Sequence, residues 1–553
     1  MVNRTKTPGQ EHSRRGWRRG SACVTVLFLL LAAMLVAPSS ENALTHAQVR
    51  RLMPVRVTTP LAPAPEDVAV VSGAEWGRFY NGPANCCESS PFVALDASGN
   101  VFITGRSTTT RTSPGGPFND DIATVKYDAQ GNQQWARRFD APGMSTDTPQ
   151  DIQADAQGNV IITGHAVVSG GDMQFVTLKY NPNGDLQWAR FAGEANGDHA
   201  LALDIDAQGN VYVTGRSIYA FRPSSEPIFR VLTVKYDAQG NELWRRTYDS
   251  DAQQGAEAAD VRVDGQGNVL ITGRVLTPVS PSGNRRDILT LKYNAAGDLQ
   301  WARTFAGAVT SAGTRVEPDG QGGVFVLGGT QVDFNNRQSD TVILHYTSAG
   351  DLVLTAFSWM PQNDNGTDWV FDSAGNIYVV GLRSIPSSSA MGTPNVDVLT
   401  LKFNAAGSLQ WARTYQGVRD GTDQPRGIFL SADGASVYVA ANSQNTNFNF
   451  DYVLVKYAAE TGSEQAVKRF DGPDHDNDLL SDAAMDAAGN FYLTGTSDRI
   501  NSSSRSVDFL TIKVGAEGPT DFIEPPEPGM IFEVHEPPPA TEIQSAVTNR
   551  RRR

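Results

Sequence analysis

Three groups of residues in this sequence have types and spacings that could support chemistry. The first is the stretch DHDND at 474–478, which places Asp474, Asp476 and Asp478 at the Asp-x-Asp-x-Asp spacing of a calcium-binding loop. The glycine and the glutamate that normally follow at the sixth and twelfth positions are absent. Calcium is one interpretation of this stretch, and a series of Asx-turns is the other. We expect no other metal or cofactor from residue spacing.

The second group is Cys86 and Cys87, which are adjacent and are the only cysteines beyond Cys23. In an exported protein these two thiols have no other partner, so they are candidates for a vicinal disulfide. The alternative is a purely structural role, as a rigid kink or as two unpaired thiols.

The third group is set by one variable residue in a repeated phrase, which reads V-x-x-T-G in its commonest form. In the first four copies the residue after the glycine is Arg106, His165, Arg216 or Arg274. In the last four copies it is Gly329, Leu382, Asn442 or Thr496. The first four residues, here named the basic arc, are candidates for binding an anionic ligand or partner surface. The alternative is a set of solvated rim charges.

The phrase belongs to a repeat that must position all of these residues. Asp-x-x-Gly turns join short apolar segments of period-2 alternation, and each repeat has room for four strands, A to D, in two hairpins. Units of 51 to 61 residues with this content indicate the blades of a β-propeller. The first turn of each unit begins at Asp96, Asp155, Asp206, Asp264, Asp319, Asp372, Asp433 or Asp486.

Counting the strands predicts how the ring closes. Seven units have all four strands, whereas the eighth ends at 508–515 without strand D. A segment of the right type, EWGRFY at 75–80, precedes the first unit. If it pairs with the last strand, no sheet edge is left open at the seam. We therefore expect an all-β, eight-bladed propeller of four-stranded antiparallel blades, closed by the N-terminal strand. The alternative is seven blades and a spare unit.

A tryptophan recurs at one place in strand D, and Leu354 and Ala466 replace it in two units. An indole in every blade could bind ligands, but burial of so large a ring between neighbouring blades is the stronger interpretation. The predicted inter-blade residues are Trp76, Trp135, Trp188, Trp244, Trp301 and Trp411.

The ends of the chain differ in composition from the repeats. A basic stretch and an apolar run ending in small residues predict a signal peptide over 1–47, with an uncleaved membrane anchor as the alternative. We expect a Pro-rich linker at 48–73, the propeller at 74–515 and a disordered acidic, Pro-rich tail at 516–553. The expected location is extracellular, at the cell surface or periplasmic.

Charge narrows the choice of partners. The formal net charge is −14, and residues 1–47 carry six of the Lys and Arg residues against two Asp and Glu, so the remainder is more acidic still. An acidic protein repels nucleic acid and anionic lipid. We expect a monomer that binds neither nucleic acid nor membrane, apart from an uncleaved anchor, and that has a protein or glycan partner.

Phrases such as DAQGNVYVTG, beginning at Asp206, and KYDAQGNELW at 235–244 resemble the bacterial SBBP (beta-propeller) repeat family. The resemblance covers residues 75–515 and implies an exported or surface scaffold without assigned catalytic residues. The family's name implies seven blades, whereas eight are counted here. The strand D wording is also similar to the tryptophan repeats of eight-bladed quinoprotein dehydrogenases, some of which place a vicinal disulfide against their quinone.

Two functions follow from these expectations. The first is a non-catalytic scaffold that binds a protein or glycan through its loop face. The alternative is a quinone- or metal-dependent enzyme on the same fold. Sequence motifs of other enzyme classes, such as G-x-S-x-G, H-E-x-x-H and the P-loop, do not occur.

Overall fold

The structure is a computed structural model, and the chain divides into two units, Met1–Pro54 and Val55–Arg553. All described residues belong to the second unit. The predicted signal peptide (1–47) and tail (516–553) lie outside them, and the predicted linker is described only in part. The described residues are 56–57, 71–84, 87–109, 119–142, 146–168, 170–193, 197–222, 225–250, 255–280, 283–307, 309–331, 338–360, 362–385, 395–417, 421–501 and 504–515.

The first four blades each contain four antiparallel strands in chain order. Blade 1 is β3 (Ser89–Leu95), β4 (Val101–Thr108), β5 (Asp120–Tyr127) and β6 (Gln133–Asp140). Blade 2 is β7 (Thr148–Ala154), β8 (Val160–Val167), β9 (Met173–Tyr180) and β10 (Leu186–Ala192). Blade 3 is β11 (His199–Ile205), β12 (Val211–Phe221), β13 (Pro227–Tyr236) and β14 (Glu242–Tyr248). Blade 4 is β15 (Ala256–Val263), β16 (Val269–Ser280), β17 (Gly283–Tyr293) and β18 (Leu299–Phe305).

The last four blades follow the same plan, except that the final one recruits a strand from the start of the chain. Blade 5 is β19 (Ser311–Pro318), β20 (Val324–Gln331), β21 (Ser339–Tyr346) and β22 (Leu352–Phe357). Blade 6 is β23 (Asp364–Phe371), β24 (Ile377–Ile385), β25 (Asn395–Phe403) and β26 (Leu409–Tyr415). Blade 7 is β27 (Asp423–Leu430), β28 (Ser436–Gln444), β29 (Phe450–Ala458) and β30 (Glu464–Phe470). Blade 8 is β31 (Asp478–Met485), β32 (Phe491–Asn501), β33 (Ser504–Val514) and β2 (Trp76–Tyr80).

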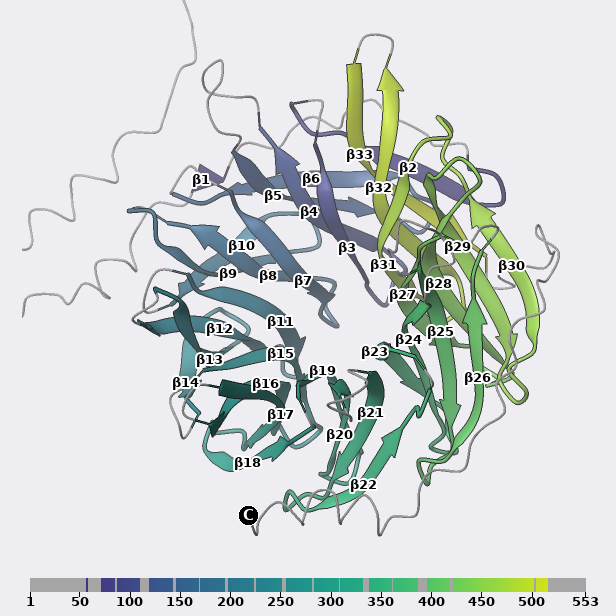
Figure 1. Ribbon diagram of the computed structural model, residues 1–553. Coiled ribbons are helices and arrows are strands. Elements are labelled where there is room, and N and C mark those ends of the chain that lie inside the picture. Colours follow the sequence, from purple (N-terminus) through teal and green to yellow (C-terminus); the bar gives the residue numbers. More distant parts are fainter. Residues whose placement is uncertain are drawn as a thin grey trace, which may run out of the picture. The chain divides into compact units, whose positions relative to one another are not determined.

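These eight blades form a ring, and Figure 1 shows the first strand of each blade nearest its centre. The prediction of an all-β, eight-bladed propeller is confirmed, and the seven-bladed alternative is excluded. A further two-residue strand, β1 (Arg56–Val57), pairs with the outer strand of blade 1. The described residues include no helix, and hence no helical segment long and apolar enough to cross a bilayer.

The Asp-x-x-Gly turns recur because one carboxylate organises the whole reversal. In the first of them, Asp96 Oδ1 accepts hydrogen bonds from the backbone N–H of Ser98 (2.8 Å) and Asn100 (2.9 Å). Gly99 completes the turn with a φ of 76°, a conformation that a side chain would disfavour. The result is a tight hairpin that leaves little room for variation.

The outer strand of each typical blade is docked onto the next blade by a tryptophan and an arginine. Trp188 donates its indole N–H to the carbonyl of Ala238 (3.2 Å), and the Arg190 Nε–H donates to the carbonyl of Gly240. The indole lies on Gly240, where an added Cβ would stand 2.7 Å from the ring. Glycine is therefore required there for two reasons: the backbone has a positive φ, and a side chain would collide with the indole.

The same two hydrogen bonds occur at five other junctions. They are made by Trp76 with Arg78, Trp135 with Arg137, Trp244 with Arg246, Trp301 with Arg303 and Trp411 with Arg413. Trp76 is half-buried, while the other five tryptophans are 5–8% exposed.

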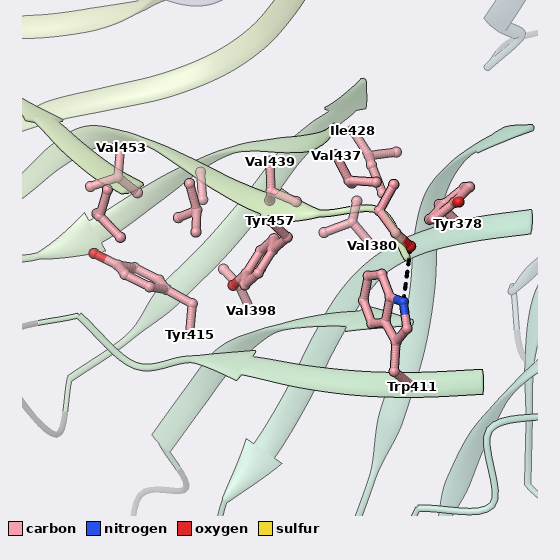
Figure 2. Close-up of a cluster of buried hydrophobic side chains, with 14 residues drawn as sticks. Tyr378, Val380, Val398, Trp411, Tyr415, Ile428, Val437, Val439, Val453 and Tyr457 are labelled. Atoms are coloured by element: carbon pink, nitrogen blue, oxygen red, sulfur yellow. Dashed lines mark hydrogen bonds between the residues drawn. The ribbon is translucent and has the colours of Figure 1, made fainter. Parts of the chain in front are cut away.

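The apolar cores also lie between blades rather than within them. Figure 2 shows Trp411, from blade 6, with its indole N–H bonded to blade 7 and its ring beside Tyr378 and Tyr457. Val380 and Val398 of blade 6 lie in the same buried cluster as valines of blade 7. No blade can bury its two faces alone, and this is why the unit is repeated.

Strand β2 closes the ring by pairing with β33, from Trp76 opposite Lys513 to Tyr80 opposite Phe509. Lys513 forms an ion pair with Glu75 (2.9 Å), and Val71 is buried against blade 7 and blade 8 residues. The seam thus uses segments at the two ends of the repeat region. The predicted closure by the N-terminal strand is confirmed.

Carboxylates satisfy the exposed backbone of the innermost strands. Asp151 accepts a hydrogen bond from Leu203 N–H (2.8 Å) in the next blade, and Asp260 accepts one from Val316 N–H (2.9 Å). The edge strand of one blade is therefore capped by the preceding blade.

Replacing Trp188 with alanine tests the docking contact. We expect Trp188→Ala to lower the stability by about 3–5 kcal/mol, because it removes a buried indole and its hydrogen bond. The measurement is the midpoint of urea unfolding. Gln187→Ala, at the exposed neighbouring position, serves as the control, and equal midpoints for the two variants would contradict the assignment.

Candidate functional site

The connections of the ring fall into two classes at opposite ends of the blades. The Asp-x-x-Gly hairpins, which join A to B and C to D, lie at the end where the tryptophans dock. The B–C and D–A connections lie at the other end, here named the loop face. Because antiparallel strands alternate in direction, the residues at the ends of the B strands share this face. The basic arc is therefore on the loop face.

Register fixes what lies opposite each residue of the basic arc. The four positions are equivalent in β4, β8, β12 and β16, directly after a glycine. Their partners on the innermost strands are Ser89 opposite Arg106, Thr148 opposite His165, His199 opposite Arg216 and Glu257 opposite Arg274.

Glu257 joins two of the predicted residues. Arg274 places Nη2 2.9 Å and 3.0 Å from the two carboxylate oxygens of Glu257, and Arg216 of the preceding blade reaches the same group at 3.3 Å. The two guanidinium side chains are 40% and 31% exposed. Two positive groups thus share one negative group at the surface.

His165 adjoins the cluster of Arg216, Arg274 and Glu257 through His199. Their ring centroids are 4.3 Å apart, although the residues come from blades 2 and 3. Burial is the main cause that lowers the pKa of His165 to about 4, and the neighbouring His199, Arg216 and Arg106 lower it further. Burial and Arg216 also lower the pKa of His199. Both imidazoles are expected to be uncharged at neutral pH.

Arg106 is neutralised within its own blade by Asp120, at 3.3 Å. Among the described residues, the three guanidinium groups of the basic arc pair with two carboxylates, Asp120 and Glu257, so the positive groups outnumber their paired carboxylates by one. The arc is less basic than the sequence alone suggests. The structure brings His165, Arg216 and Arg274 into one continuous group and leaves Arg106 at its edge.

Two of the later blades use the equivalent position for packing, whereas Leu382 and Thr496 are half-buried. Asn442 is fully buried and exchanges two hydrogen bonds with the backbone of Leu480 in the next blade. At Gly329 an added Cβ would stand 1.9 Å from the side chain of Asn365. The asymmetry of the sequence thus corresponds to a charged half and a packed half.

Sequence reasoning did not identify His199 and Glu257 as parts of the site. Both stand seven residues before the turn aspartate of their blade, and this spacing could have placed them near the arc. The exact pairing could not be counted, because a bulge between Ala258 and Asp260 shifts the register by one residue.

The hairpin of blade 3 extends beyond Arg216. Its strands β12 and β13 have 11 and 10 residues, longer than the 7 residues of β11 and β14 that flank them. Phe229 lies under the Arg216 guanidinium at 4.8 Å, and Phe221 at the end of β12 is 61% exposed. An aromatic surface therefore adjoins the basic arc.

The structure does not bring Asp474, Asp476 and Asp478 together. Asp478 is buried and lies instead with Asp451 and Asp471, with one carboxylate oxygen from each within 4.8 Å of the others. Asp474 faces Arg499 at 3.7 Å. Within the new group Asp451 is paired with Arg469 (3.1 Å) and Asp471 with His475 (2.6 Å), and these partners oppose a bound cation.

The predicted vicinal disulfide cannot be described, because Cys86 lies outside the described residues. Cys87 is exposed and has a φ of 69°. Its carbonyl accepts a hydrogen bond from the Thr108 hydroxyl (3.1 Å).

Comparisons with known proteins are consistent with a repeat protein of this kind. No family model matches the chain, so the SBBP-type phrases stay a resemblance. The chain is similar to the regulatory protein FlaEY of Caulobacter vibrioides, with 23% identity over 381 residues that cover 57% of this chain and 38% of the relative. An uncharacterized WD repeat-containing protein of Acanthamoeba polyphaga mimivirus is 22% identical over 260 residues, which cover 38% of this chain and 18% of the relative. The chain therefore spans less than half the length of either relative.

The solved structures to which the chain is similar are more distant in sequence. One is a protein of unknown function from Dyadobacter fermentans, with a TM-score of 0.38 and 8% identity, covering 81% of this chain and 99% of that one. Another is the β-propeller domain of the Trilobed protease from Pyrococcus furiosus, with a TM-score of 0.37 and 9% identity, covering 69% and 97%. At these TM-scores the structures say nothing about function.

Replacing Arg216 tests the electrostatic link within the site. We expect Arg216→Gln to raise the pKa of both His165 and His199, because it removes a positive charge that opposes protonation of both rings. The measurement is an NMR titration of the imidazole protons, assigned with His165→Asn. Arg245→Gln, at the opposite end of blade 3, is the control and should move neither pKa. Unchanged values in Arg216→Gln would contradict the described arrangement.

Proposed function

We propose that this protein is an exported, non-catalytic β-propeller that binds an anionic protein or glycan partner through its loop face. The observation that carries the proposal is the carboxylate of Glu257, which is shared by the partly exposed Arg216 and Arg274, so that among the described residues two positive groups are paired with one negative group. Export is inferred from the signal-like pattern of residues 1–47.

The pairing with Glu257 supports binding rather than simple neutralisation. A single carboxylate holds two guanidinium groups close together, and both arginine side chains remain partly exposed. Guanidinium groups arranged in this way suit a carboxylate, sulfate or phosphate of a partner. The cost of ordering the two long side chains is met before the partner arrives.

The outer-strand arginines that dock blades 2, 3 and 4 onto their neighbours have a different role. Arg190, Arg246 and Arg303 donate to hairpin carbonyls of neighbouring blades and are needed for the assembly of the ring. The charges at the hairpin end are thus committed, whereas those of the basic arc remain partly exposed. Variation at the loop face does not disturb the docking contacts.

The overall charge favours an oriented encounter. The chain is acidic, with a formal net charge of −14, so an anionic partner is repelled by most of its surface. A local positive group then directs such a partner to one place, an effect that weakens with salt. The adjoining Phe221 and Phe229 add apolar contact area.

Charge reversal on the two faces tests this proposal. We expect Arg216→Glu combined with Arg274→Glu to weaken capture of the partner from an extract of the source organism by about tenfold or more. The measurement is quantitative affinity purification at two salt concentrations, with the native protein as reference.

The matched control is Arg245→Glu, which changes the same residue type in another arginine–glutamate pair at the hairpin end. It should leave capture unchanged. Equal capture by the native protein and the double variant would rule out the basic arc as the binding site. Chemical conversion of the captured molecule by the native protein would contradict a non-catalytic role.

A further inference from the structure

A second recurring position carries acidic residues that the binding proposal does not use. It stands eight residues before the first position of the A–B turn, which is Ser431 in blade 7 and the turn residue named above in the other blades, where the D–A connection enters the innermost strand. Six of the eight blades have an acid there, and each is 0–1% exposed. These residues, here named junction acids, are Glu88, Asp147, Asp198, Asp364, Asp423 and Asp478.

Each junction acid lies at the boundary with the preceding blade. The backbone N–H of Asp147 donates to Asp120 of blade 1 (2.7 Å), and that of Glu88 donates to Val507 of blade 8 (3.0 Å). The third strand of the preceding blade carries its own buried acid close by in five cases. The facing pairs are Asp121 with Asp147, Asp340 with Asp364, Asp397 with Asp423, Asp451 with Asp478, and Asp508 with Glu88.

The junction between blades 1 and 2 shows the arrangement most clearly. Asp147 Oδ2 accepts the Ala141 N–H (2.6 Å), while its buried Oδ1 has no hydrogen-bond partner among the described residues. Asp140 and Asp121 face Asp147 as further carboxyl groups. Burial raises the pKa of Asp147 to about 8, and those two acids raise it further.

The positive groups that the described residues contribute to this junction are paired with other carboxylates. Arg138 is paired with Asp121 at 3.1 Å, and Arg106 is paired with Asp120 at 3.3 Å. Neither contact extends to the open oxygen of Asp147. A proton on that oxygen would relieve both the unsatisfied burial and the repulsion between carboxylates.

The junction between blades 8 and 1 is similar. Glu88 Oε1 accepts hydrogen bonds from Gly82 N–H and the Ser107 hydroxyl, both at 2.9 Å, and its buried Oε2 has no partner among the described residues. Burial raises the pKa of Glu88 to about 8, with a further contribution from Asp508. Arg499 lies 3.6 Å from Asp508.

Two more charged or titratable groups face this part of blade 1. The Tyr80 hydroxyl interacts with Glu88, and Arg138 donates to the same Ser107 hydroxyl that Glu88 accepts from (3.1 Å). Arg138 is already shared with Asp121, so the junction retains more carboxyl groups than guanidinium groups.

The junction between blades 6 and 7 repeats the pattern a third time. Burial raises the pKa of Asp423 to about 8, Asp397 raises it further, and Ser443 and Arg469 act in the opposite direction. Arg469 is paired with Asp451 at 3.1 Å, and Asp397 accepts a hydrogen bond from Gln416 (3.0 Å). Arg383 also interacts with Asp397.

We propose that the blade junctions of this ring are proton-binding sites, at which Glu88, Asp147 and Asp423 stay neutral in the folded protein and ionise when the blades separate. Protons then act as ligands that bind the assembled ring in preference to the opened one. The folded ring is therefore more stable in mild acid and less stable in mild alkali.

The sign of the effect follows from linkage. In the unfolded chain these acids ionise near their ordinary pKa of about 4, whereas in the folded chain they keep their protons to about pH 8. Between those values the folded state binds more protons, so stability falls as the pH rises. For each proton that the folded protein retains, a rise of one pH unit increases the unfolding equilibrium constant about tenfold.

The test compares native protein with the triple variant Glu88→Gln, Asp147→Asn and Asp423→Asn, in which amides imitate the protonated acids. The measurement is the midpoint of thermal unfolding at pH 5 to 9. We expect the native midpoint to fall steadily from pH 5 to pH 8 and the variant to show a smaller fall, because the remaining buried acids, such as Asp151 and Asp340, still contribute. An equally steep fall in both proteins would overturn the proposal.

Controls separate protons from other causes. Asp237→Asn removes an exposed turn carboxylate whose pKa is lowered in the folded protein, because its hydrogen bonds outweigh its slight burial. It should keep the native slope. If the triple variant does not fold, Asp147→Asn alone should reduce the slope by a smaller amount, and an unchanged slope would count against the proposal.

Two further outcomes bear on the ligand. Infrared difference spectroscopy of the folded native protein near pH 7 should show the carbonyl stretch of protonated carboxyl groups, and this band should be weaker in the triple variant. If calcium at pH 8 instead restores the native midpoint to its value at pH 5, the junction acids bind a cation and the proposal is wrong.

Discussion

The ring depends on one contact, the packing of an outer-strand tryptophan and arginine onto the hairpin of the next blade. Both side chains donate to backbone carbonyls, as Trp135 does to Pro182 and Arg137 does to Gly184. The acceptors belong to the main chain, so the contact constrains only the shape of the hairpin and the glycine under the indole. This explains why the hairpin sequence is repeated while the loop sequences vary. The contact also joins Trp76 to blade 1, so it operates across the seam.

The docking contacts lie at the hairpin end of the blades, so the loop face is available for binding and can carry charged side chains. At the loop face, Glu257 holds Arg216 and Arg274 in a group with net positive charge, and His165 and His199 remain neutral beside it. Between the blades, by contrast, the loop connections bury acids such as Asp147. The two features use different residues, so a change of pH can alter the stability of the ring without removing the arginines of the proposed binding site.

The repeat made the fold predictable, because spacing, turn residues and the missing strand of the last unit all specify the same eight-bladed ring. The candidate site was less predictable. The sequence placed Arg216 and Arg274 on one face, but their neutralisation by Glu257 depends on a bulge that counting cannot locate. The structure places the three aspartates of the calcium alternative apart, because Asp478 begins strand β31 and lies in the blade junction with Asp451 and Asp471, whereas Asp474 faces Arg499. Facing acids from different blades, such as Asp121 and Asp147, come together only when the strands are placed in space.

The most direct test of the docking contact is to install it where it is missing. Blade 5 has Leu354 and Ala356 in place of the tryptophan and arginine, and both lie against Gly407 of blade 6. In the double variant Leu354→Trp and Ala356→Arg, the indole and guanidinium can reach the carbonyls of Ala405 and Gly407. In urea unfolding, the variant should have a higher midpoint than the native protein. The corresponding increase in the free energy of unfolding should be about 1 kcal/mol or more. An unchanged or lower midpoint in a correctly folded variant would contradict the claim that this contact holds the ring together.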